Sequence, residues 1–594
     1  MWIQRYLHFN LCKLPHPTNL SHFIYYAHLS SCVNSNFYDY SGGDEELKYS
    51  NLLRKCTACS SLIHGRAVHG KFVKLAIHSS SLYLHNFLLN MYVKCGDLKN
   101  GVQLFDEMPH RNVVSWTAVI AAFVQHGRPI EALFFFSRMH HTGTARPNGF
   151  TFVSVLQACS FSNTLMPAYQ VYGFILKVGL ESNIYLVNAF LTALLRHNQF
   201  SEALYVFDNC LNRDIVSWNA MMAGYLQYSF ADVPGFWCKM IREGVMPDNY
   251  TFASLLTALS ALTDLTLGLQ VHARLAKSGH GNEMCVGNSL VDMYLKNQKL
   301  ADGWKAFEEM PCRDVHTWTQ VAAGCLNCGE PREALEVVKE MREMGVKPNK
   351  FTLVTALNAC ANLASLDDGN RFHGLKIKLG DEVDVCVDNA LLDMYAKCGL
   401  MDSALSVFRS MKDRTVVSWT TMIMGYAQNG HARKALDIFS EMRVEGPEPN
   451  YITFICVLYA CSLGGYIDEA WRHISSMNDD YGISPGEDHY ACMVNLLGLA
   501  GRTKEAEALI LQMPSKPGVL VWQTLLGACR LHGDIDTATR AAKHALNLDR
   551  HAPSTYVLLS NTFADTSNWN AVGTLRELMG SRDVKKMYGS SWIS

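Results

Sequence analysis

The stretch VVSWTAVIAAF at residues 113–123 decides the fold, because close copies of it return three times along the chain. The copies are IVSWNAMMAGY at 215–225, VHTWTQVAAGC at 315–325 and VVSWTTMIMGY at 416–426. Their tryptophans lie 102, 100 and 101 residues apart, at Trp116, Trp218, Trp318 and Trp419. A fixed period in a long chain indicates a repeat architecture.

Each interval between tryptophans contains two further recurring phrases. FTFVSVLQAC at 150–159 returns as FTLVTALNAC, and NFLLNMYVKCG at 86–96 returns as NALLDMYAKCG. The interval therefore divides into units of about 35, 35 and 31 residues, whose sum equals the tryptophan spacing. The predicted units begin at residues 46, 82, 113, 149, 184, 215, 249, 284, 315, 350, 385, 416, 451 and 487, and the last one ends at 518.

Each unit contains two amphipathic stretches. In residues 113–148 these are SWTAVIAAFVQHG and PIEALFFFSRMHHTG, with apolar residues at helical spacing. Gly127 and Pro129 separate the two stretches, and Gly143 and Pro147 end the unit. A single helix–turn–helix hairpin cannot bury its apolar face, so neighbouring hairpins must stack. The sequence predicts an all-α fold, an α-solenoid of stacked hairpins that forms a right-handed superhelix.

The composition limits the class of protein. Apolar residues make up 49% of the 594 residues and charged residues 18%, and 52 Lys and Arg against 54 Asp and Glu give a net charge of −2. A nucleic-acid binder is expected to be basic, so the near-neutral charge favours a protein-binding scaffold as an alternative. No run of 18 apolar residues is present, and we expect no membrane partner.

Many of the 19 cysteines recur at one place in the units. Cys159, Cys360 and Cys461 are each the eleventh residue of a unit, which predicts reduced packing thiols and not a disulfide framework. His69, His272 and His373 also repeat in one register, which favours a packing or turn-facing role over catalysis.

Three motifs that resemble chemical sites are better explained by the repeats. GRAVHGKF at 65–72 lacks the Ser or Thr of a phosphate-binding loop, and the pairs Cys56/Cys59 and Cys325/Cys328 lie too far apart for one zinc site. No histidine is followed two residues later by Glu, as the nucleobase deaminases require. We therefore predict no catalytic residue, no metal and no cofactor, and a protein that is not an enzyme.

The sequences at the two ends of the chain differ from the repeat pattern. Residues 1–38 contain no Asp or Glu and include Arg5 and Lys13, which resembles an organelle transit peptide, with an ordinary disordered N-terminus as the alternative. We therefore predict a transit peptide and disordered segment at 1–45, about 14 repeats at 46–518, and two divergent helical hairpins at 519–594.

The ordered triplet of units, with VVSW[TN]xMIxGY, FTFxxVLxAC and NALxDMYxKCG, resembles plant pentatricopeptide repeat proteins of the PLS subfamily, E class. Residues 519–594 resemble the E domain of that family, and the chain stops at SSWIS, where longer relatives continue into a DYW-type deaminase domain. The resemblance implies sequence-specific binding of single-stranded organellar RNA in a mitochondrion or, alternatively, a chloroplast. It further implies recognition of sites for C-to-U editing, with a DYW-type cytidine deaminase recruited in trans and editing accessory proteins as further partners. The alternatives are an RNA stability or splicing factor without editing and a helical protein scaffold.

In that family each repeat reads one base, mainly through the fifth residue of a unit and its last residue. The resemblance assigns these pairs and bases: Asn86/Asn112 to a pyrimidine, Thr117/Asn148 to A, Asn188/Asp214, Asn219/Asp248 and Asn288/Asp314 to U, Thr319/Asn349 to A, the off-pattern pair Asn389/Thr415 to a pyrimidine, and Thr420/Asn450 to A. A Thr hydroxyl can donate to a purine ring nitrogen, and an ionised Asp can accept from uracil. The alternative is that these residues only cap the first helix of a unit.

Other positions of the units are less specific. The L-type units have Val153, Ala253, Val354 and Ile455 in fifth place, so their bases are left open. The second residues Val114, Val216 and Val417 resemble apolar wedges that sandwich bases, with packing at the helix start as the alternative, and His316 could stack instead. The unit 113–148 is one residue long and the unit 215–248 one residue short, which could weaken their base assignments.

Overall fold

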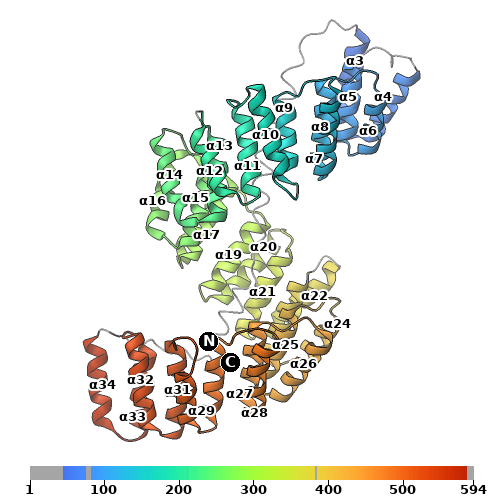
Figure 1. The fold of residues 1–594 in the computed structure, drawn as a ribbon. Coiled ribbons are helices and arrows are strands. Elements are labelled where there is room, and N and C mark those ends of the chain that lie inside the picture. The colour runs from blue at the N-terminus through green and yellow to red at the C-terminus, as the bar shows by residue number, and fades with distance from the viewer. Residues whose placement is uncertain (1–43, 75–81, 211, 381–383, 583, 585–594) are drawn as a thin grey trace. The chain divides into compact units, whose positions relative to one another are not determined.

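The computed structural model describes residues 44–74, 82–210, 212–380, 384–582 and 584. Within these residues all regular structure is helical: 32 α-helices and two 3-10 helices, η2 and η3 (Figure 1). The predicted all-α class is confirmed. The predicted transit peptide lies almost wholly outside the described residues.

The helices form two compact units, one ending at Cys312 and the other beginning at Arg313. The first contains α3 (Asp44–Ala58), α4 (Leu62–Lys74), α5 (Leu82–Lys94), α6 (Leu98–Glu107), α7 (Val113–Gln125), α8 (Pro129–Thr142), α9 (Gly149–Ser160), α10 (Met166–Val178), α11 (Ile184–Arg196), α12 (Phe200–Asn209), α13 (Ile215–Tyr228), η2 (Phe230–Asp232), α14 (Val233–Arg242), α15 (Asn249–Leu262), α16 (Leu265–Ser278), η3 (His280–Asn282), α17 (Met284–Lys296) and α18 (Leu300–Glu308).

The second unit contains α19 (Val315–Asn327), α20 (Pro331–Glu343), α21 (Lys350–Leu363), α22 (Leu366–Leu379), α23 (Val385–Lys397), α24 (Met401–Ser410), α25 (Val416–Gln428), α26 (Ala432–Glu445), α27 (Tyr451–Gly464), α28 (Ile467–Asp479), α29 (Glu487–Leu499), α30 (Thr503–Leu511), α31 (Val519–His532), α32 (Ile535–Leu548), α33 (Pro553–Asp565) and α34 (Trp569–Ser581).

Odd-numbered helices are the first helices of the hairpins and even-numbered helices the second. Within each compact unit a first helix packs against its own second helix and against the first helix of the next hairpin. Figure 1 shows this stacking clearly for α29 to α34. From residue 82 to residue 519, every first helix begins at the residue that opens a predicted repeat or the predicted tail. The hairpin prediction is therefore confirmed at its boundaries.

The recurring tryptophan joins one repeat to the next. Trp116, Trp218, Trp318 and Trp419 are each at most 2% exposed. Trp116 packs edge-to-face on Phe105 of the preceding second helix, with ring centroids 4.8 Å apart. The Trp419–Phe408 pair has the same 4.8 Å spacing. Burial of large aromatic rings between hairpins is a main source of solenoid stability, which explains why the opening phrase recurs.

The repeated cysteines and histidines pack as predicted. Cys159 and Cys360 are fully buried, and burial raises the pKa of each thiol to about 12. The His69, His272 and His373 rings hydrogen bond to tyrosine hydroxyls of the following first helix at 2.8, 2.7 and 2.8 Å, the partners being Tyr92, Tyr294 and Tyr395. These histidines link neighbouring repeats.

The motifs that resembled chemical sites lie in ordinary repeat positions. GRAVHGKF lies within the helix α4, and Cys56 and Cys325 are buried in first helices. Among the described residues, no group of three or more His, Cys, Asp or Glu side chains could hold a metal ion. No helix in the described part of the chain is long and apolar enough to span a membrane.

Candidate nucleic-acid interface

The last residue of each paired repeat is the N-cap of the next first helix. Asparagine and aspartate side chains at this place accept the backbone N–H of the residue three positions on, at 2.9 to 3.0 Å. They are Asn112, Asn148, Asp214, Asp248, Asp314, Asn349 and Asn450. The last residues of these repeats therefore do cap the next first helix. The fifth residues lie more than one turn inside the helix and do not cap it.

Asparagine in fifth place bonds to the last residue of its own repeat. The Asn188 amide Nδ2 donates to Asp214 Oδ1 at 3.1 Å, and the Asn219 amide donates to both carboxylate oxygens of Asp248 at 3.0 Å. The Asn86 amide reaches Asn112 Oδ1 at 3.4 Å. The structure thus brings together the two members of three predicted pairs.

A third residue, which the sequence analysis missed, completes each of these contacts. The hydroxyls of Ser115, Ser217 and Thr251 donate at 2.7 Å to Oδ1 of Asn86, Asn188 and Asn219, respectively. These hydroxyl residues are at most 1% exposed. Their signal in the sequence is the Ser or Thr that recurs as the third residue of the first helices beginning at 113, 149, 215, 249, 315, 350, 416 and 451. The fifth residue, the N-cap and this hydroxyl form one buried network across the repeat boundary.

Threonine in fifth place is connected differently. The hydroxyls of Thr117, Thr319 and Thr420 donate at 2.7 Å to the backbone carbonyl four residues earlier. Each also lies 2.7 to 3.2 Å from the hydroxyl of Thr151, Thr352 or Thr453, which in turn donates to the N-cap asparagine at 3.0 Å. Among the described residues, none accepts from the N-cap amides of Asn148, Asn349 and Asn450.

The two kinds of pair therefore present opposite chemistry. An Asn–Asp pair offers a carboxylate, which accepts hydrogen bonds. In a Thr–Asn pair the asparagine oxygen is occupied by the helix cap, and its NH₂ group is left as a donor. A base edge with a hydrogen-bond donor fits the carboxylate, and a base edge with an acceptor fits the NH₂ group.

One predicted pair departs from this scheme. Asn389 is 5% exposed and its Oδ1 has no hydrogen-bond partner among the described residues. The Ser418 hydroxyl, which would reach it, bonds instead to Thr415, 3.1 Å from the backbone N and 3.3 Å from Oγ1. Of the pair Asn288/Asp314, Asn288 lies half-buried in α17 and Asp314 caps α19.

The unusual lengths of two repeats do not disturb their pairs. In 215–248 the turn between helices is replaced by η2, which leads directly into α14. The Asn219–Asp248 contact is nevertheless intact. In 113–148, Asn148 still caps α9. The differences in length are absorbed between the helices, away from the paired residues.

Hydrophobic residues occupy the remaining predicted positions. In fifth place Ala253 and Ile455 are each 5% exposed, whereas Val153 and Val354 are half-buried; none can form a side-chain hydrogen bond. In second place Val114 and His316 are exposed, and Val216 and Val417 are half-buried. The sequence analysis missed three exposed aromatic rings that also lie in second place of a repeat: Phe150, Tyr185 and Phe351.

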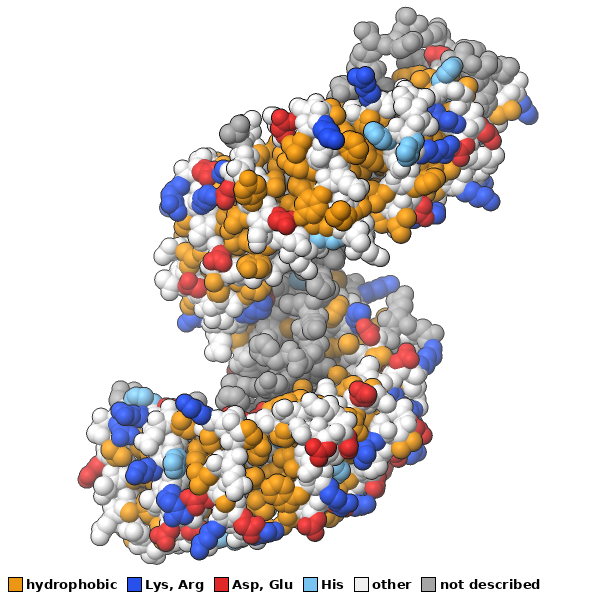
Figure 2. Space-filling model, viewed as in Figure 1, with side chains coloured by type: hydrophobic (Ala, Val, Ile, Leu, Met, Phe, Trp, Pro, Cys, Tyr) orange, Lys and Arg blue, Asp and Glu red, His pale blue; other side chains and the backbone are white. Residues whose placement is uncertain are grey.

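Basic residues recur at one position in some of the repeats. A basic residue ends the first helix in four repeats: Lys94, Arg196, Lys296 and Lys397. Lys296 pairs with Asp292 at 2.9 Å and Lys397 with Asp393 at 2.7 Å. Figure 2 shows basic and acidic side chains interspersed on the face in view. The charge pattern matches the near-zero net charge.

The repeats and the tail match known sequence families. The PPR repeat matches residues 83–113, 114–143, 389–416 and 488–517, and the PPR repeat family matches 313–362 and 414–463. The E motif matches 532–594, which includes α32, α33 and α34. The predicted boundary of the tail at 519 stays a prediction.

Whole-chain comparisons agree. The chain is 36% identical to the Arabidopsis thaliana pentatricopeptide repeat-containing protein At3g15130, over 91% of this chain and 79% of that protein. It is 35% identical to the mitochondrial At3g53360, over 92% and 72%, and 34% identical to the chloroplastic At1g15510, over 91% and 62%, both from the same plant. The fold is similar to that of maize PPR10 in complex with an 18-nt psaJ RNA element, with a TM-score of 0.53 at 18% identity, covering 90% of this chain and 84% of that one.

The matches of the repeats, of the tail and of the whole chain all indicate the same protein family. The chain belongs to the pentatricopeptide repeat family and carries an E motif.

The orphaned Asn389 oxygen leads to a stability prediction. Thr415→Asp would give the Asn389 amide a carboxylate acceptor and free the Ser418 hydroxyl to donate to Asn389 Oδ1, as in the Asn188 and Asn219 networks. We expect the free energy of unfolding to rise by about 0.5–1.5 kcal/mol, measured by urea denaturation. The matched variant Thr415→Val should lower it, because it removes the cap. An Asp variant no more stable than the wild type would contradict this account of the network.

His489 replaces the buried hydroxyl residue in the repeat that begins at Glu487. It is fully buried, its Nδ1 accepts the Gly486 backbone N–H at 3.2 Å, and its Nε2 donates to the Tyr451 carbonyl at 3.0 Å. This arrangement needs the neutral ring. Burial, the largest effect, lowers the pKa of His489 below its ordinary value of 6.5.

Because the unfolded chain protonates this histidine first, the free energy of unfolding should fall as pH decreases from about 6.5 toward the lowered folded-state pKa. The variant His489→Thr should lose less stability than the wild type between about pH 7.5 and pH 5.5. Urea denaturation at the two pH values measures the difference. The exposed His551→Thr variant serves as the control and should follow the wild type. Equal losses in all three proteins would exclude His489 as a source of the pH dependence.

Proposed function

We propose that this protein binds single-stranded RNA in a sequence-specific manner, with one base read by the fifth and last residues of a repeat. The observation that supports this most strongly is the series of buried networks in which an N-cap residue is held against the fifth residue of the preceding first helix. A protein-binding scaffold would need only the N-cap hydrogen bonds, without a contact between the N-cap and the fifth residue. The fold likeness to PPR10, solved in complex with RNA, supports the same proposal.

The geometry refines the proposed base recognition. In an Asn–Asp pair the carboxylate accepts from the ring N–H of uracil. In a Thr–Asn pair the hydroxyl proton of the threonine is directed to its own helix carbonyl, as at Thr319 and Val315. The N-cap NH₂ group, at Asn349 for example, is therefore a better donor to an adenine ring nitrogen than the threonine hydroxyl. The bases assigned to the pairs do not change.

With the repeats read 5′ to 3′ from 82–112, the proposed target is Y-A-n-U-U-n-U-A-n-Y-A-n-n. In the family's alignment the repeat 487–518 lies four nucleotides before an edited cytidine, so three more bases precede that C. The exposed second-place rings Phe150, Tyr185 and Phe351 are available to stack on bases.

We further propose that the bound RNA carries a site for C-to-U editing and that a DYW-type cytidine deaminase acts on it in trans. The E motif at 532–594 supports a docking role for α31–α34, where Leu531, Leu548 and Trp569 are exposed. The organelle would be the mitochondrion or, alternatively, the chloroplast, since relatives are named for each. A role in RNA stability or splicing remains the alternative within RNA binding.

A specificity switch tests base reading. Thr319→Asn together with Asn349→Asp should change that repeat from A to U, because the donor amide is replaced by a carboxylate. Mismatches in nucleic-acid sites cost about 1–3 kcal/mol, so the affinity for the original RNA should fall roughly 5- to 150-fold. An RNA with U at that place should restore it, as measured by filter binding.

The control for the switch is Lys397→Ala, which should weaken both RNAs alike and reduce the dependence of affinity on salt. If the compensating RNA does not rescue binding, this pair does not read a base. Enrichment of RNA from lysate without any preferred sequence would instead favour a scaffold.

The editing role has its own test. The purified protein should bind its RNA without converting C to U, and conversion should require a DYW-bearing partner. Deleting 519–594 should leave RNA affinity nearly unchanged, because the assigned pairs all lie before residue 451, but should abolish editing in the organelle. Because deletion uncovers α29, the surface variant Trp569→Glu is the matched test of docking. Restored editing by both altered proteins in a null plant would overturn the recruitment proposal.

A further inference from the structure

Two of the five equivalent repeat junctions lack the histidine–tyrosine hydrogen bond that links the others. One of them, between α28 and α29, has Ile474 and Leu497 at the two positions. The bond joins α4 to α5, α16 to α17, and α22 to α23. At the equivalent junction between α10 and α11, the histidine position is Tyr172 and the tyrosine position is Leu194. Neither side chain can reproduce the bond, and the space is organised differently.

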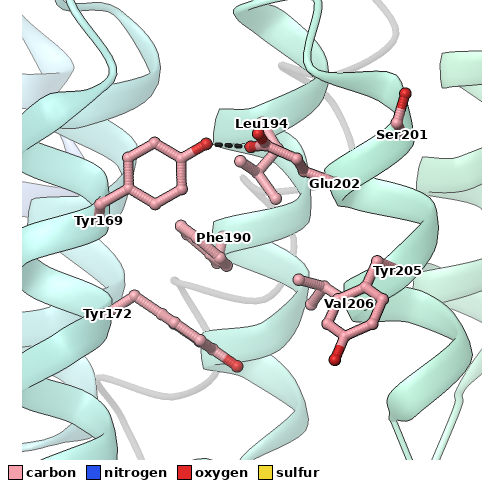
Figure 3. A pocket seen from close by; sticks show the side chains of 8 residues that line it. All are labelled: Tyr169, Tyr172, Phe190, Leu194, Ser201, Glu202, Tyr205 and Val206. Carbon is pink, nitrogen blue, oxygen red and sulfur yellow. Dashed lines mark hydrogen bonds between the residues drawn. The ribbon is translucent and has the colours of Figure 1, made fainter.

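A cavity of about 350 Å³ opens at this junction. Figure 3 shows Tyr169 and Tyr172 projecting from α10 on one side, Phe190 and Leu194 from α11 behind, and Tyr205 from α12 on the other side. The remaining lining residues are Ser201, Glu202 and Val206 of α12. Four of the eight lining side chains are aromatic. We call this group of eight residues the aromatic cage.

The rings of the cage are held in place. Tyr172 stacks on Phe190 with ring centroids 4.0 Å apart and planes 6° from parallel, and Tyr169 meets Phe190 edge-to-face at 6.1 Å. Phe190 is 2% exposed and anchors both tyrosines. Tyr205, in contrast, is 71% exposed and stands at the mouth of the cage. The packed rings of Tyr169, Tyr172 and Phe190 form the floor of the cage, and the side with Tyr205 is open to a ligand.

One carboxylate, that of Glu202, belongs to the mainly apolar lining of the cage. The Tyr169 hydroxyl donates to the Glu202 carboxylate. No lysine or arginine in the described part of the chain forms an ion pair with Glu202. Aromatic faces are also electrostatically negative, and together with a carboxylate they attract cations, above all alkylated ammonium groups. An apolar occupant would cover the carboxylate without compensating its charge.

The cage lies away from the proposed RNA-reading residues. Phe190 follows Asn188 by two residues in α11, which places the two side chains roughly 200° apart around the helix. Asn188 points to the network with Asp214, and Phe190 points to α10. Hydrophobic side chains also gather over α10 and α12 on the face seen in Figure 2. Met166 and Leu176 of α10 are exposed.

We propose that the aromatic cage binds an alkylated ammonium group. Two sources share this chemistry: a methylated lysine side chain of a partner protein and a free choline-type compound. The tyrosine rings would surround the methyl groups, and the Glu202 carboxylate would balance the charge. This site is independent of RNA binding and occurs at one of the five equivalent junctions.

Calorimetric titration of the full chain tests the charge requirement first. Choline should bind at least about 10-fold more tightly than 3,3-dimethylbutanol, its neutral isostere, because cation–π attraction acts on the charge. A trimethyllysine peptide is compared with the same peptide carrying unmodified lysine or arginine. Preference for the trimethyllysine peptide over choline would identify a protein partner, and the reverse a small molecule.

Surface variants locate the site. Tyr205→Ala and Glu202→Gln should each weaken binding of the preferred probe about 2- to 30-fold, the range of cation–π and exposed charge contacts. Tyr228→Ala is the matched control, since Tyr228 is also 71% exposed but does not line the cage. The double variant Tyr172→His with Leu194→Tyr, which rebuilds the usual hydrogen bond, should abolish binding. RNA affinity should be unchanged in all of them.

Three results would overturn the proposal. The first is equal binding of choline and its neutral isostere, which would make the cage an apolar pocket only. The second is the absence of binding by every ammonium probe up to about 10 mM, where a millimolar Kd would be saturated. The third is binding that Tyr205→Ala and Glu202→Gln leave intact. Circular dichroism establishes that each variant is folded.

Discussion

One side chain at each repeat boundary connects the fold to the candidate site. An asparagine or aspartate N-cap satisfies the first free N–H groups of a helix and is thereby fixed in space. At Asp214 and Asp248 the same carboxylate accepts the amide of the fifth residue in the preceding first helix. Because capping already holds this group, its position for recognition requires no further ordering. The stacking of hairpins repeats the N-cap along each compact unit, at Asn349 and Asn450 in the second, whereas the carboxylate–amide contact is found at Asp214 and Asp248 in the first.

The hydroxyl residue of the network decides which polar group is left over. Ser217 and Thr251 donate to the fifth-place asparagine, so the acidic N-cap stays an acceptor. When threonine is in fifth place, its hydroxyl is occupied by its own helix, as at Thr319, and the N-cap asparagine retains a donor. Two residue types at two positions thus produce opposite hydrogen-bonding character without any change in the backbone.

Departures from the repeat pattern mark the places where neighbouring hairpins differ. At Thr415 the Ser418 hydroxyl bonds to the N-cap residue and not to Asn389, and the buried Asn389 Oδ1 is left without a donor. Replacing the linking histidine and tyrosine by Tyr172 and Leu194 leaves a cavity in place of a hydrogen bond. Both follow from single side chains, because a solenoid repeat contacts only its neighbours and each junction forms independently.

The sequence by itself determined the helical class and the starts of the first helices, and its resemblance to a family predicted which residues form pairs. The triplet period placed the first helix of the repeats at Val113, Ile215 and Val416, since helix starts depend on local capping and apolar spacing. Only the tertiary structure decided what those residues contact. The Ser217–Asn188 bond and the cage at Tyr172 join residues on different helices. Such contacts form only when hairpins stack, and no local pattern of the chain encodes them.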